Sequence, residues 1–474
     1  MAVAIVTAGI ILLEILGLVS AVHALRSTRT TQGTIAWIIS LITFPVLSVP
    51  AYWILGRNRF QGYVSARQSG DDAVNAFVSQ LYDIIARYRK IDPAQGEVYY
   101  AVEKLAQLPY TGGNKSELLI DGEATFNSIL KGIDDARDYI LFQFFIIKND
   151  EIGQEVKSRL IAKAKQGLRI YFLYDEIGCY ELPESYKKEL QAAGVEVYNF
   201  HTRKGASNRF QINFRNHRKL VVVDGNTIWV GGHNVGDEYL GKSTKFGRWR
   251  DTHVRIDGPA AIAAQLSFVE DWYWATESLP ELNWVPNTDH GDDETVLIIP
   301  SGPADELETA LLMFVHAINL AQQRIWITSP YFVPDEATMS ALQLAGLRGV
   351  DVRILIPDKP DHLLVFLAAF SYFEDASRTG VRFYRYTDGF LHQKVMLVDD
   401  KAATIGTANF DNRSFRLNFE ITCVISDKDF VAGVERMLEQ DFARSRLMVA
   451  EDVDKKSFLF KLGVRLARLA APVL

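Results

Sequence analysis

Two histidines of this chain lie in almost the same sequence context, and both contexts suit chemistry on a phosphate group. In each, a lysine follows the histidine by two residues and an aspartate follows the lysine by five. The two sets are His217, Lys219 and Asp224, and His392, Lys394 and Asp399. Side chains two residues apart on a strand share a face, so each set places an imidazole beside an ammonium. An imidazole can act as a nucleophile or as a general acid and base, and an ammonium suits a phosphate oxygen. We interpret the two sets as the halves of one catalytic site.

Each set continues through a short apolar segment into a turn of small residues. The first turn reads Gly231-Gly232-His233-Asn234 and the second reads Gly406-Thr407-Ala408-Asn409. Small residues let backbone N–H groups approach an anion, and an asparagine amide can join them. The candidates for phosphate binding are therefore Gly232, Asn234, Thr407 and Asn409.

Two further carboxylates, Asp251 and Glu420, each begin a later apolar strand. Either could accept the outer N–H of a motif imidazole and so fix its tautomer and orientation. The alternative is that each simply begins a surface strand, and we favour the orienting role. Asp224, in contrast, precedes Gly225 in hairpin-turn chemistry. We expect Asp224 and Asp399 to support structure more than chemistry, although they belong to the motifs.

The elements around the two motifs also occur twice, which predicts a duplicated fold. Each copy has three apolar, strand-like segments separated by helical ones. They are residues 139–147, 167–174 and 194–200 in the first copy, and 324–333, 349–356 and 380–386 in the second. Strands alternating with helices predict an α/β fold, here duplicated α-β-α sandwich domains over residues 111–290 and 291–450. We expect the two half-sites to meet across a pseudo-twofold interface.

The first copy contains an additional loop ahead of its motif, within residues 201–215, and this loop is basic. Its cations are Arg203, Lys204, Arg209 and Arg215. The loop is either a solvated surface loop or a grip for anionic head groups, and the sequence does not separate the two.

Two apolar runs open the chain, at residues 2–25 and 34–55, and each is long enough to cross a bilayer as a helix. We predict a two-helix membrane hairpin over residues 1–60, its second helix kinked by Pro45 and Pro50. The alternatives are a cleaved signal peptide and a buried hairpin. The arginines flanking the helices barely distinguish the two orientations, and we expect the catalytic part in the cytoplasm. Residues 61–110 read as a helical connector.

The chain ends in a basic amphipathic segment, expected as a helix within residues 451–474. Its apolar positions are Phe458, Leu459, Leu462, Leu466 and Leu469, and its basic positions are Lys461, Arg465 and Arg468. This composition suits a membrane interface with anionic lipid. A terminal helix packed on the core is the alternative.

Composition limits the partners. A net charge of −7 over 474 residues argues against a general nucleic-acid binder, which is usually basic. The two cysteines, Cys179 and Cys423, form no zinc-type spacing, and the sequence predicts neither a metal site nor a cofactor. The sequence leaves open whether the chain forms a homo-oligomer.

The paired motifs and their turns resemble the phospholipase D superfamily over about residues 118–450. The finer resemblance is to membrane-anchored bacterial cardiolipin synthases with two such motifs. The residues that carry it are Trp37, Pro45, Tyr52, Gly56 and Arg57; Asn216 to Lys219; residues 327–334; residues 406–409 with Asp411, Arg413 and Ser414; and residues 415–420. The first turn has Gly232 where many members have serine, a difference that we expect to have no consequence.

This resemblance implies a transfer of a phosphatidyl group between two phosphatidylglycerol molecules at the inner membrane of the cell. In such a reaction one histidine attacks phosphorus and forms a phosphatidyl-histidine, and the other protonates the departing glycerol. It then deprotonates the acceptor, giving cardiolipin and glycerol without a metal. The resemblance assigns His217 as the nucleophile and His392 as the acid and base.

Four other functions use the same motifs or the same anchor. The first is a phospholipase D that hydrolyses phospholipid to phosphatidic acid. The second is a phosphatidyltransferase with another partner such as phosphatidylethanolamine. The third is a membrane-tethered phosphodiesterase or nuclease, which the acidic composition disfavours. The fourth is a structural membrane protein with inactive sites, which two intact motifs disfavour.

Overall fold

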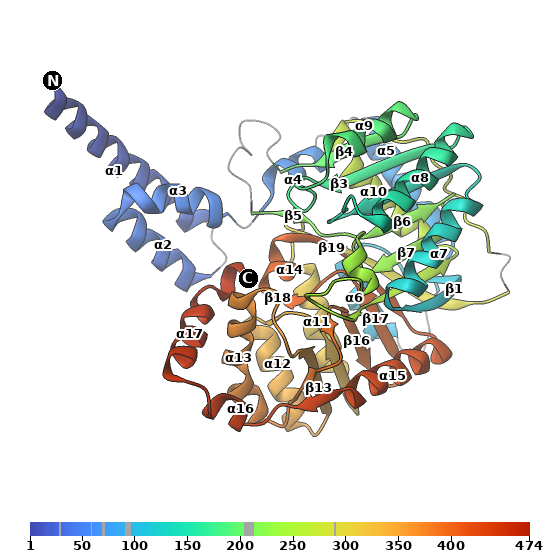
Figure 1. Ribbon diagram of the computed structural model, residues 1–474. Coiled ribbons are helices and arrows are strands. Elements are labelled where there is room, and N and C mark those ends of the chain that lie inside the picture. Colours follow the sequence, from blue (N-terminus) through green and yellow to red (C-terminus); the bar gives the residue numbers. More distant parts are fainter. Residues whose placement is uncertain (28–29, 58, 69–71, 91–95, 203–212, 289–290) are drawn as a thin grey trace. The chain divides into compact units, whose positions relative to one another are not determined.

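The computed structural model describes residues 1–27, 30–57, 59–68, 72–90, 96–202, 213–288 and 291–474, which form two compact units (Figure 1). Unit 1 consists of Met1–Ser69, His201–Phe214 and Pro303–Glu306. Unit 2 consists of Gly70–Phe200, Arg215–Gly302 and Leu307–Leu474. Three cations of the basic loop, Arg203, Lys204 and Arg209, lie outside the described residues.

Unit 1 contains the apolar runs, and only the first of them forms one long helix. Its helices are α1 (Ala2–Ser27), α2 (Thr31–Thr43), α3 (Pro45–Leu55) and α4 (Gln61–Gln68). Within the described chain, only α1 is long and apolar enough to cross a membrane, over Ile5–Ser27. The prediction of one kinked helix over residues 34–55 is wrong, because the chain leaves the helical conformation at Phe44 (φ −135°, ψ 57°). Pro45 lacks an N–H and so begins a new helix instead of continuing the old one.

The three apolar helices pack on one another around a small cluster. Its buried side chains are Ala21, Ala24, Leu41, Val49 and Tyr52. Polar contacts accompany this cluster: the indole N–H of Trp53 donates to Ser20 Oγ at 3.0 Å, and His23 Nδ1 lies 2.6 Å from the Tyr52 hydroxyl. The large apolar side chains of α1 elsewhere face outward, with Ile5 66% exposed and Leu18 57% exposed. This bundle therefore leaves an apolar exterior around a partly polar seam.

Unit 2 contains a sheet in which the two repeats have the same strand order. The strands of the first repeat are β1 (Thr111–Ile120), β2 (Tyr139–Phe144), β3 (Arg169–Asp175), β4 (Glu196–Phe200), β6 (Leu220–Val223), β7 (Thr227–Gly231) and β9 (Thr252–Asp257). Those of the second are β10 (Glu294–Ser301), β11 (Arg324–Thr328), β13 (Asp351–Pro357), β14 (Arg382–Tyr386), β16 (Val395–Val398), β17 (Ala402–Gly406), β19 (Asn418–Ile425) and the edge strand β20 (Ser445–Leu447). From the seam outward the order is β1-β9-β7-β6-β2-β3-β4 on one side and β10-β19-β17-β16-β11-β13-β14 on the other. Antiparallel pairing of β1 with β10 joins the halves, so the predicted duplication is confirmed.

Helices cover both faces of this sheet. The strands β2, β6, β16 and β19 are buried at every position, which requires cover on both faces because successive side chains point to opposite sides. The first repeat supplies α7 (Asp121–Asp135), α8 (Glu151–Lys165), α9 (Glu184–Ala192) and α10 (Ala260–Thr276), and the second supplies α11 (Thr309–Leu320), α12 (Glu336–Leu347), α13 (Leu363–Ser377) and α15 (Lys428–Ala443). The predicted helical connector contains α5 (Asp72–Ala86) and α6 (Gly96–Ala106), and α16 (Glu451–Asp454) and α17 (Phe458–Leu469) follow the second repeat.

The motif aspartates occupy the hairpin turns that follow β6 and β16. Asp224 and Asp399 both adopt φ of 52°, a left-handed conformation that aspartate tolerates better than most residues. The Asp224 carboxylate accepts the backbone N–H groups of Arg137, Asp138 and Tyr139 at 2.8–3.0 Å. Asp399 accepts those of residues 322–324 in the same way, at 2.8–3.1 Å. Each aspartate therefore ties its hairpin to the start of the neighbouring strand, β2 or β11.

Replacing Asp399 by asparagine should destabilise the fold without touching the histidines. The Asp399→Asn variant loses a charged acceptor of three backbone N–H groups but keeps a side chain that tolerates positive φ. We expect a loss of about 1–3 kcal/mol in the free energy of unfolding. The measurement is urea denaturation of the detergent-solubilised protein, followed by tryptophan fluorescence. The exposed neighbour gives the control, Asp400→Asn, which should stay within about 0.5 kcal/mol; equal midpoints for the two variants would contradict the structural role.

Candidate active site

Two short pairs of parallel strands exchange backbone contacts between the repeats and position the histidines. β5 (Arg215–Asn216) pairs with the start of β19, and β15 (Phe390–Leu391) pairs with β8 (Trp249–Arg250). The next residue in each case is a motif histidine. The His217 N–H donates to the Phe419 carbonyl at 2.9 Å, and the His392 N–H donates to the Arg250 carbonyl at 2.8 Å. Each histidine is therefore held beside the residue that precedes the other repeat's carboxylate.

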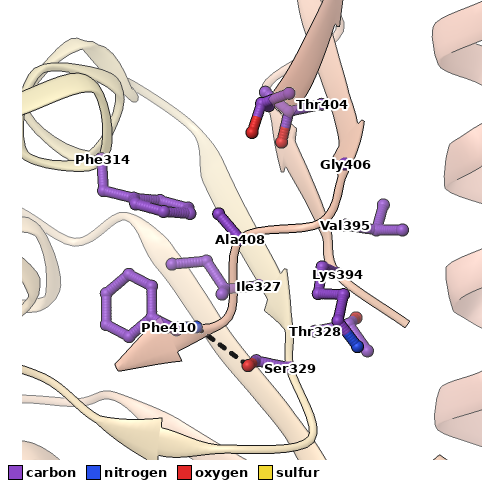
Figure 2. A pocket seen from close by; sticks show the side chains of 11 residues that line it. Phe314, Ile327, Thr328, Ser329, Lys394, Val395, Thr404, Gly406, Ala408 and Phe410 are labelled. Atoms are coloured by element: carbon purple, nitrogen blue, oxygen red, sulfur yellow. Dashed lines mark hydrogen bonds between the residues drawn. The ribbon is translucent and has the colours of Figure 1, made fainter. Parts of the chain in front are cut away.

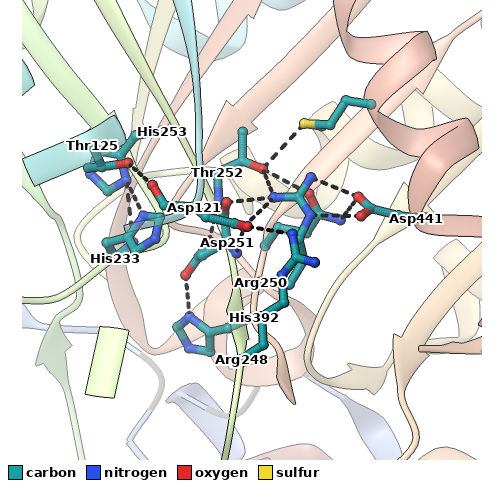
Figure 3. Close-up of polar contacts among 12 residues, drawn as sticks. Asp121, Thr125, His233, Arg248, Arg250, Asp251, Thr252, His253, His392 and Asp441 are labelled. Atoms are coloured by element: carbon teal, nitrogen blue, oxygen red, sulfur yellow. Dashed lines mark hydrogen bonds and ion pairs between the residues drawn. The ribbon is translucent and has the colours of Figure 1, made fainter. Parts of the chain in front are cut away.

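The side chains complete this exchange. His217 Nδ1 lies 2.9 and 3.0 Å from the two oxygens of Glu420. His392 Nδ1 lies 2.7 Å from Asp251 Oδ2, a contact drawn in Figure 3. The sequence predicted carboxylates that orient the imidazoles, and the structure adds that each carboxylate comes from the opposite repeat. With Nδ1 occupied, Nε2 is the nitrogen left for a substrate.

The two carboxylates are fully buried, and their surroundings differ. Glu420 accepts the Ser414 hydroxyl at 2.9 Å and the Asn418 amide at 3.1 Å. Asp251 accepts the N–H of Thr252 at 2.8 Å. Burial by itself would raise the pKa of both carboxyls, but the neighbouring cations and imidazoles outweigh it and lower both pKa values. Both groups are therefore carboxylates at neutral pH.

Gly232, which follows β7, and Thr407, which follows β17, show why the two turns differ in sequence. A Cβ on Gly232 would lie 2.0 Å from Asp251 Oδ1, so only glycine fits without moving the carboxylate. In the second repeat the Thr407 hydroxyl hydrogen-bonds to the longer Glu420 side chain and accepts the Ile421 N–H at 2.9 Å. The expectation that Gly232 has no consequence is therefore wrong: the glycine makes room for the partner of His392.

The motif lysines are more deeply buried than the histidines. Lys219 is 0% exposed and Lys394 is 4% exposed. Lys219 Nζ donates to the His217 carbonyl at 2.8 Å, and Lys394 Nζ lies 3.0 Å from His392 Nδ1. Burial lowers the pKa of Lys219 to about 7 and that of Lys394 to about 8, and each of the two also feels both carboxylates. Near neutral pH both lysines therefore lose their proton more readily than an ordinary lysine does.

Burial acts on the imidazoles in the same direction. Burial, together with the lysines of both repeats, lowers the pKa of His217 and of His392 to about 4. Both imidazoles are therefore neutral at neutral pH, with Nδ1–H facing the carboxylate and a lone pair on Nε2; at His392, Lys394 Nζ lies 3.1 Å from that Nε2. Lys394 acts on His217, and Lys219 acts on His392, although each pair is far apart in sequence, which indicates that the two motifs share one site.

A small pocket lies beside Lys394, between β11, β16 and the second turn (Figure 2). Its walls are largely apolar, formed by Phe314, Ile327 and Phe410, which accounts for the cost of charging this lysine. The Phe410 N–H donates to Ser329 Oγ at 3.0 Å and so fixes the chain just after the turn. The buried Thr328 hydroxyl has no partner among the described residues.

The two turn asparagines are not equivalent. Asn234 Oδ1 accepts the Ile146 N–H at 3.1 Å, and its Nδ2 donates to the Tyr239 hydroxyl at 3.1 Å. Both ends of this amide are therefore engaged within the first repeat, and it could reach a phosphate only by giving up a bond. The Asn409 Oδ1 is buried without a partner in the described part of the chain, so this amide remains the better candidate for a ligand.

Two carboxylates escaped the sequence analysis, Asp271 on α10 and Asp441 on α15. Each accepts a hydrogen bond from the residue between the motif histidine and lysine. Arg218 donates to Asp271 at 2.8 Å, and Gln393 donates to Asp441 at 2.8 Å. Asp441 also holds the guanidinium of Arg250 through two bonds of 2.7 Å. A signal that could have found Asp271 is a lone aspartate in the apolar helix α10. Helix α15 contains four acidic residues, and no pattern in it distinguishes Asp441 from the others.

Comparison with known proteins agrees with this geometry. Residues 129–267 and 314–442 match the family described as cardiolipin synthase, PLD-like domain, and residues 15–57 match the phospholipase D-nuclease N-terminal family. Over 466 residues the chain is 47% identical to cardiolipin synthase A of Pseudomonas putida strain W619, covering 98% of this chain and 97% of that protein. It is also 47% identical to cardiolipin synthase A of Pseudomonas aeruginosa strain LESB58, covering 98% and 95%.

One solved structure shares the fold. It is the phosphatidylserine synthase of Haemophilus influenzae Rd KW20, with a TM-score of 0.57 at 18% identity, covering 80% of this chain and 100% of that one. The likeness extends to the fold alone. The two full-length relatives and the matched repeats together show that this chain belongs to the bacterial cardiolipin synthases of the phospholipase D superfamily.

Proposed function

We propose that this enzyme transfers a phosphatidyl group from one phosphatidylglycerol to another and so makes cardiolipin and glycerol. The observation that carries the proposal is the pair of buried imidazoles, each oriented through Nδ1 by a carboxylate of the opposite repeat. Two buried lysines add positive charge at the same place. The names of the full-length relatives support the choice of lipid substrate and acceptor.

In the first step, His217 Nε2 attacks the phosphorus of phosphatidylglycerol. The bond from phosphorus to the terminal glycerol oxygen breaks, and that oxygen takes a proton from His392. The products of this step are a phosphatidyl group bonded to His217 and free glycerol. Glu420 stabilises the positive charge that forms on His217, because it is a buried carboxylate in contact with Nδ1.

In the second step, a hydroxyl of a second phosphatidylglycerol attacks the same phosphorus. His392 takes the hydroxyl proton, the bond between nitrogen and phosphorus breaks, and cardiolipin leaves. Lys219 and Lys394 stabilise the phosphate oxygens in both steps, with Asn409 and the backbone at Thr407 as further donors. Asp224 and Asp399 act on the fold of the hairpins and not on the substrate.

The electrostatics of the site are consistent with these two transfer steps. His217 must be neutral to attack, and burial keeps it so. His392 must be protonated to act as an acid, and an arriving phosphate anion raises the pKa of a nearby imidazole and of both lysines. The negative charge of the substrate thus favours protonation of His392, which that histidine needs to act as the acid.

The anchor supports delivery of both lipids from one membrane. We propose that unit 1 enters the inner membrane with two spans and that the catalytic unit lies in the cytoplasm. The second span would be the broken pair α2 and α3, since a break in lipid is tolerated where side chains satisfy the freed carbonyls. The Ser48 hydroxyl lies 2.6 Å from the Ser40 carbonyl oxygen and also contacts that of Phe44, which meets this condition.

A product assay tests the proposed reaction. The full chain in phosphatidylglycerol vesicles should release glycerol and form cardiolipin in equal amounts, as measured by lipid mass spectrometry. The His217→Ala and His392→Ala variants should each lose at least about a thousandfold in rate, since the two groups act in one chemical unit. Phosphatidic acid as the main product would instead establish a hydrolytic phospholipase D. Incorporation of added phosphatidylethanolamine would establish a different acceptor.

The exchanged carboxylates should separate the two histidine roles. Glu420→Gln keeps the shape of the side chain but removes the charge that orients and stabilises His217, and Asp251→Asn does the same to His392. We expect each to lower kcat by about 10²–10⁴-fold, the range for acid–base and triad-type groups. With radiolabelled lipid and rapid acid-free quenching, Glu420→Gln should fail to accumulate the phosphatidyl-enzyme. Accumulation in Glu420→Gln but not in Asp251→Asn would reverse the assignment of nucleophile and acid.

The pH dependence should reflect the lowered lysine pKa values. Free enzyme binds the anionic lipid best while both lysines are charged, so kcat/KM should fall as pH rises through about 7–8. It should also fall below about pH 4, where protonation of the imidazoles removes the nucleophile. The measurement is the initial rate of glycerol release at limiting lipid across this range. A flat profile up to about pH 10, the ordinary range of lysine, would contradict the burial effect.

A further inference from the structure

Helix α17 (Phe458–Leu469) presents an apolar face that no described part of the chain covers. The side chains of this face are Phe458, Leu459, Leu462, Leu466 and Leu469, and they are 77%, 76%, 41%, 57% and 78% exposed. At 3.6 residues per turn these positions fall on one side of the helix. We call this set the open face of α17.

A different side of the same helix attaches it to the second repeat. The Phe460 ring lies 5.2 Å from the Phe370 ring on α13, and Val464 and Ala467 are buried. Arg468 lies over the Tyr372 ring and donates to the Ser371 carbonyl at 2.8 Å. The helix is therefore fixed to α13 by one side and does not need the open face for its own packing.

Cations border the open face of α17, and one of them, Arg468, also lies 3.6 Å from the Asp375 carboxylate of α13. The positive residues are Lys455, Lys456, Lys461, Arg465 and Arg468, whereas residues 455–473 include no aspartate or glutamate. On the helix, Lys461, Arg465 and Arg468 form a stripe along one border of the open face. This arrangement complements a surface that is apolar within and negatively charged at its boundary, as an anionic bilayer is.

We propose that the open face of α17 docks on an anionic lipid bilayer and forms a second membrane contact, separate from the apolar helices of unit 1. The proposal rests on the membrane attachment of the proposed function but not on its chemistry. A second copy of the chain fits less well, since five side chains fall short of the roughly 800 Å² per partner of a specific interface. The basic border would also repel its own copy.

Docking at α17 would orient the catalytic site toward its lipids. The chain after α17 continues through η4 (Ala471–Val473), and the Arg413 N–H donates to the Leu474 backbone oxygen at 2.8 Å. Arg413 belongs to the short helix α14 (Asn412–Arg416), whose Ser414 holds the Glu420 carboxylate. A short chain of contacts, from η4 through Leu474 and α14, therefore connects the open face of α17 to Glu420.

The test measures, for the full chain in vesicles, whether a label on α17 enters the bilayer. Both natural cysteines are buried, so a Leu462→Cys substitution gives a single accessible thiol for an environment-sensitive nitrobenzoxadiazole label. Vesicles of phosphatidylcholine alone are compared with vesicles that also contain phosphatidylserine, an anionic lipid outside the proposed reaction. Lipids carrying a quencher in the acyl chain should quench the label at least about twofold more in the anionic vesicles. A label at the exposed position of Glu439→Cys on α15 should not be quenched in either.

Charge variants complete the test. Lys455→Gln and Arg465→Gln should each lower the docking constant by about fivefold, the effect of about one basic residue near an anionic surface. They leave the catalytic residues untouched, so cardiolipin formation in detergent should be unchanged. Absence of lipid quenching at position 462 in anionic vesicles would overturn the proposal. Equal quenching in both vesicle types would overturn the role of charge, and neither result would bear on the chemistry at His217.

Discussion

The exchange of carboxylates between the repeats is the constraint on which the site depends. Neither repeat contains a complete half-site, because His217 is oriented by Glu420 and His392 by Asp251. The β1–β10 seam sets the halves side by side, and the two short parallel strand pairs set the register within a residue. A slip of one residue in either pair would turn the histidine to the opposite face. The duplication is therefore a requirement of the chemistry as well as of the fold.

The same site concentrates charge in the protein interior. Two ammonium groups and two carboxylates are nearly or fully buried within one region, together with two imidazoles. Burying charges is unfavourable even when they are paired, and the lowered pKa values of the lysines and histidines record this cost. An anionic phosphate between the lysines relieves it. The site therefore favours the binding of an anion, and the unfavourable burial of these charges contributes to substrate affinity.

Local patterns predicted the parts of the molecule that depend on near neighbours. The turn at Asp224 and Gly225 and the duplicated strands rest on spacing along the chain, and the structure has them where the pattern placed them. The expectation that His217 and Lys219 lie on a strand is wrong, because β5 ends at Asn216 and β6 begins only at Leu220. Asp271 and Asp441 were missed because their partners, Arg218 and Gln393, lie 53 and 48 residues away in sequence. The sequence analysis expected Pro45 to kink the second helix, but it did not predict the complete break at Phe44, because hydropathy does not show the backbone torsions of that residue.

Gly232 and Asn234 show a second limit of such reasoning. Matched positions in two repeats suggest matched roles, but Gly232 yields space to a short aspartate while Thr407 binds a longer glutamate. Asn234 is engaged with Ile146 and Tyr239, whereas the equivalent oxygen of Asn409 has no partner among the described residues. Sequence symmetry could not reveal these differences, because the first arises from side-chain lengths across the interface and the second from neighbours of Asn234 within the first repeat.

The asymmetry has a chemical use. A two-step transfer needs one imidazole that is neutral when the other is protonated, and two identical environments would give both the same pKa. His217 faces a glutamate that also accepts Ser414 and Asn418, while His392 faces a shorter aspartate and lies close to the Lys394 ammonium. Burial nevertheless lowers the pKa of both imidazoles to about 4. The difference in protonation that the reaction requires must therefore develop when an anionic phosphate enters these unequal surroundings.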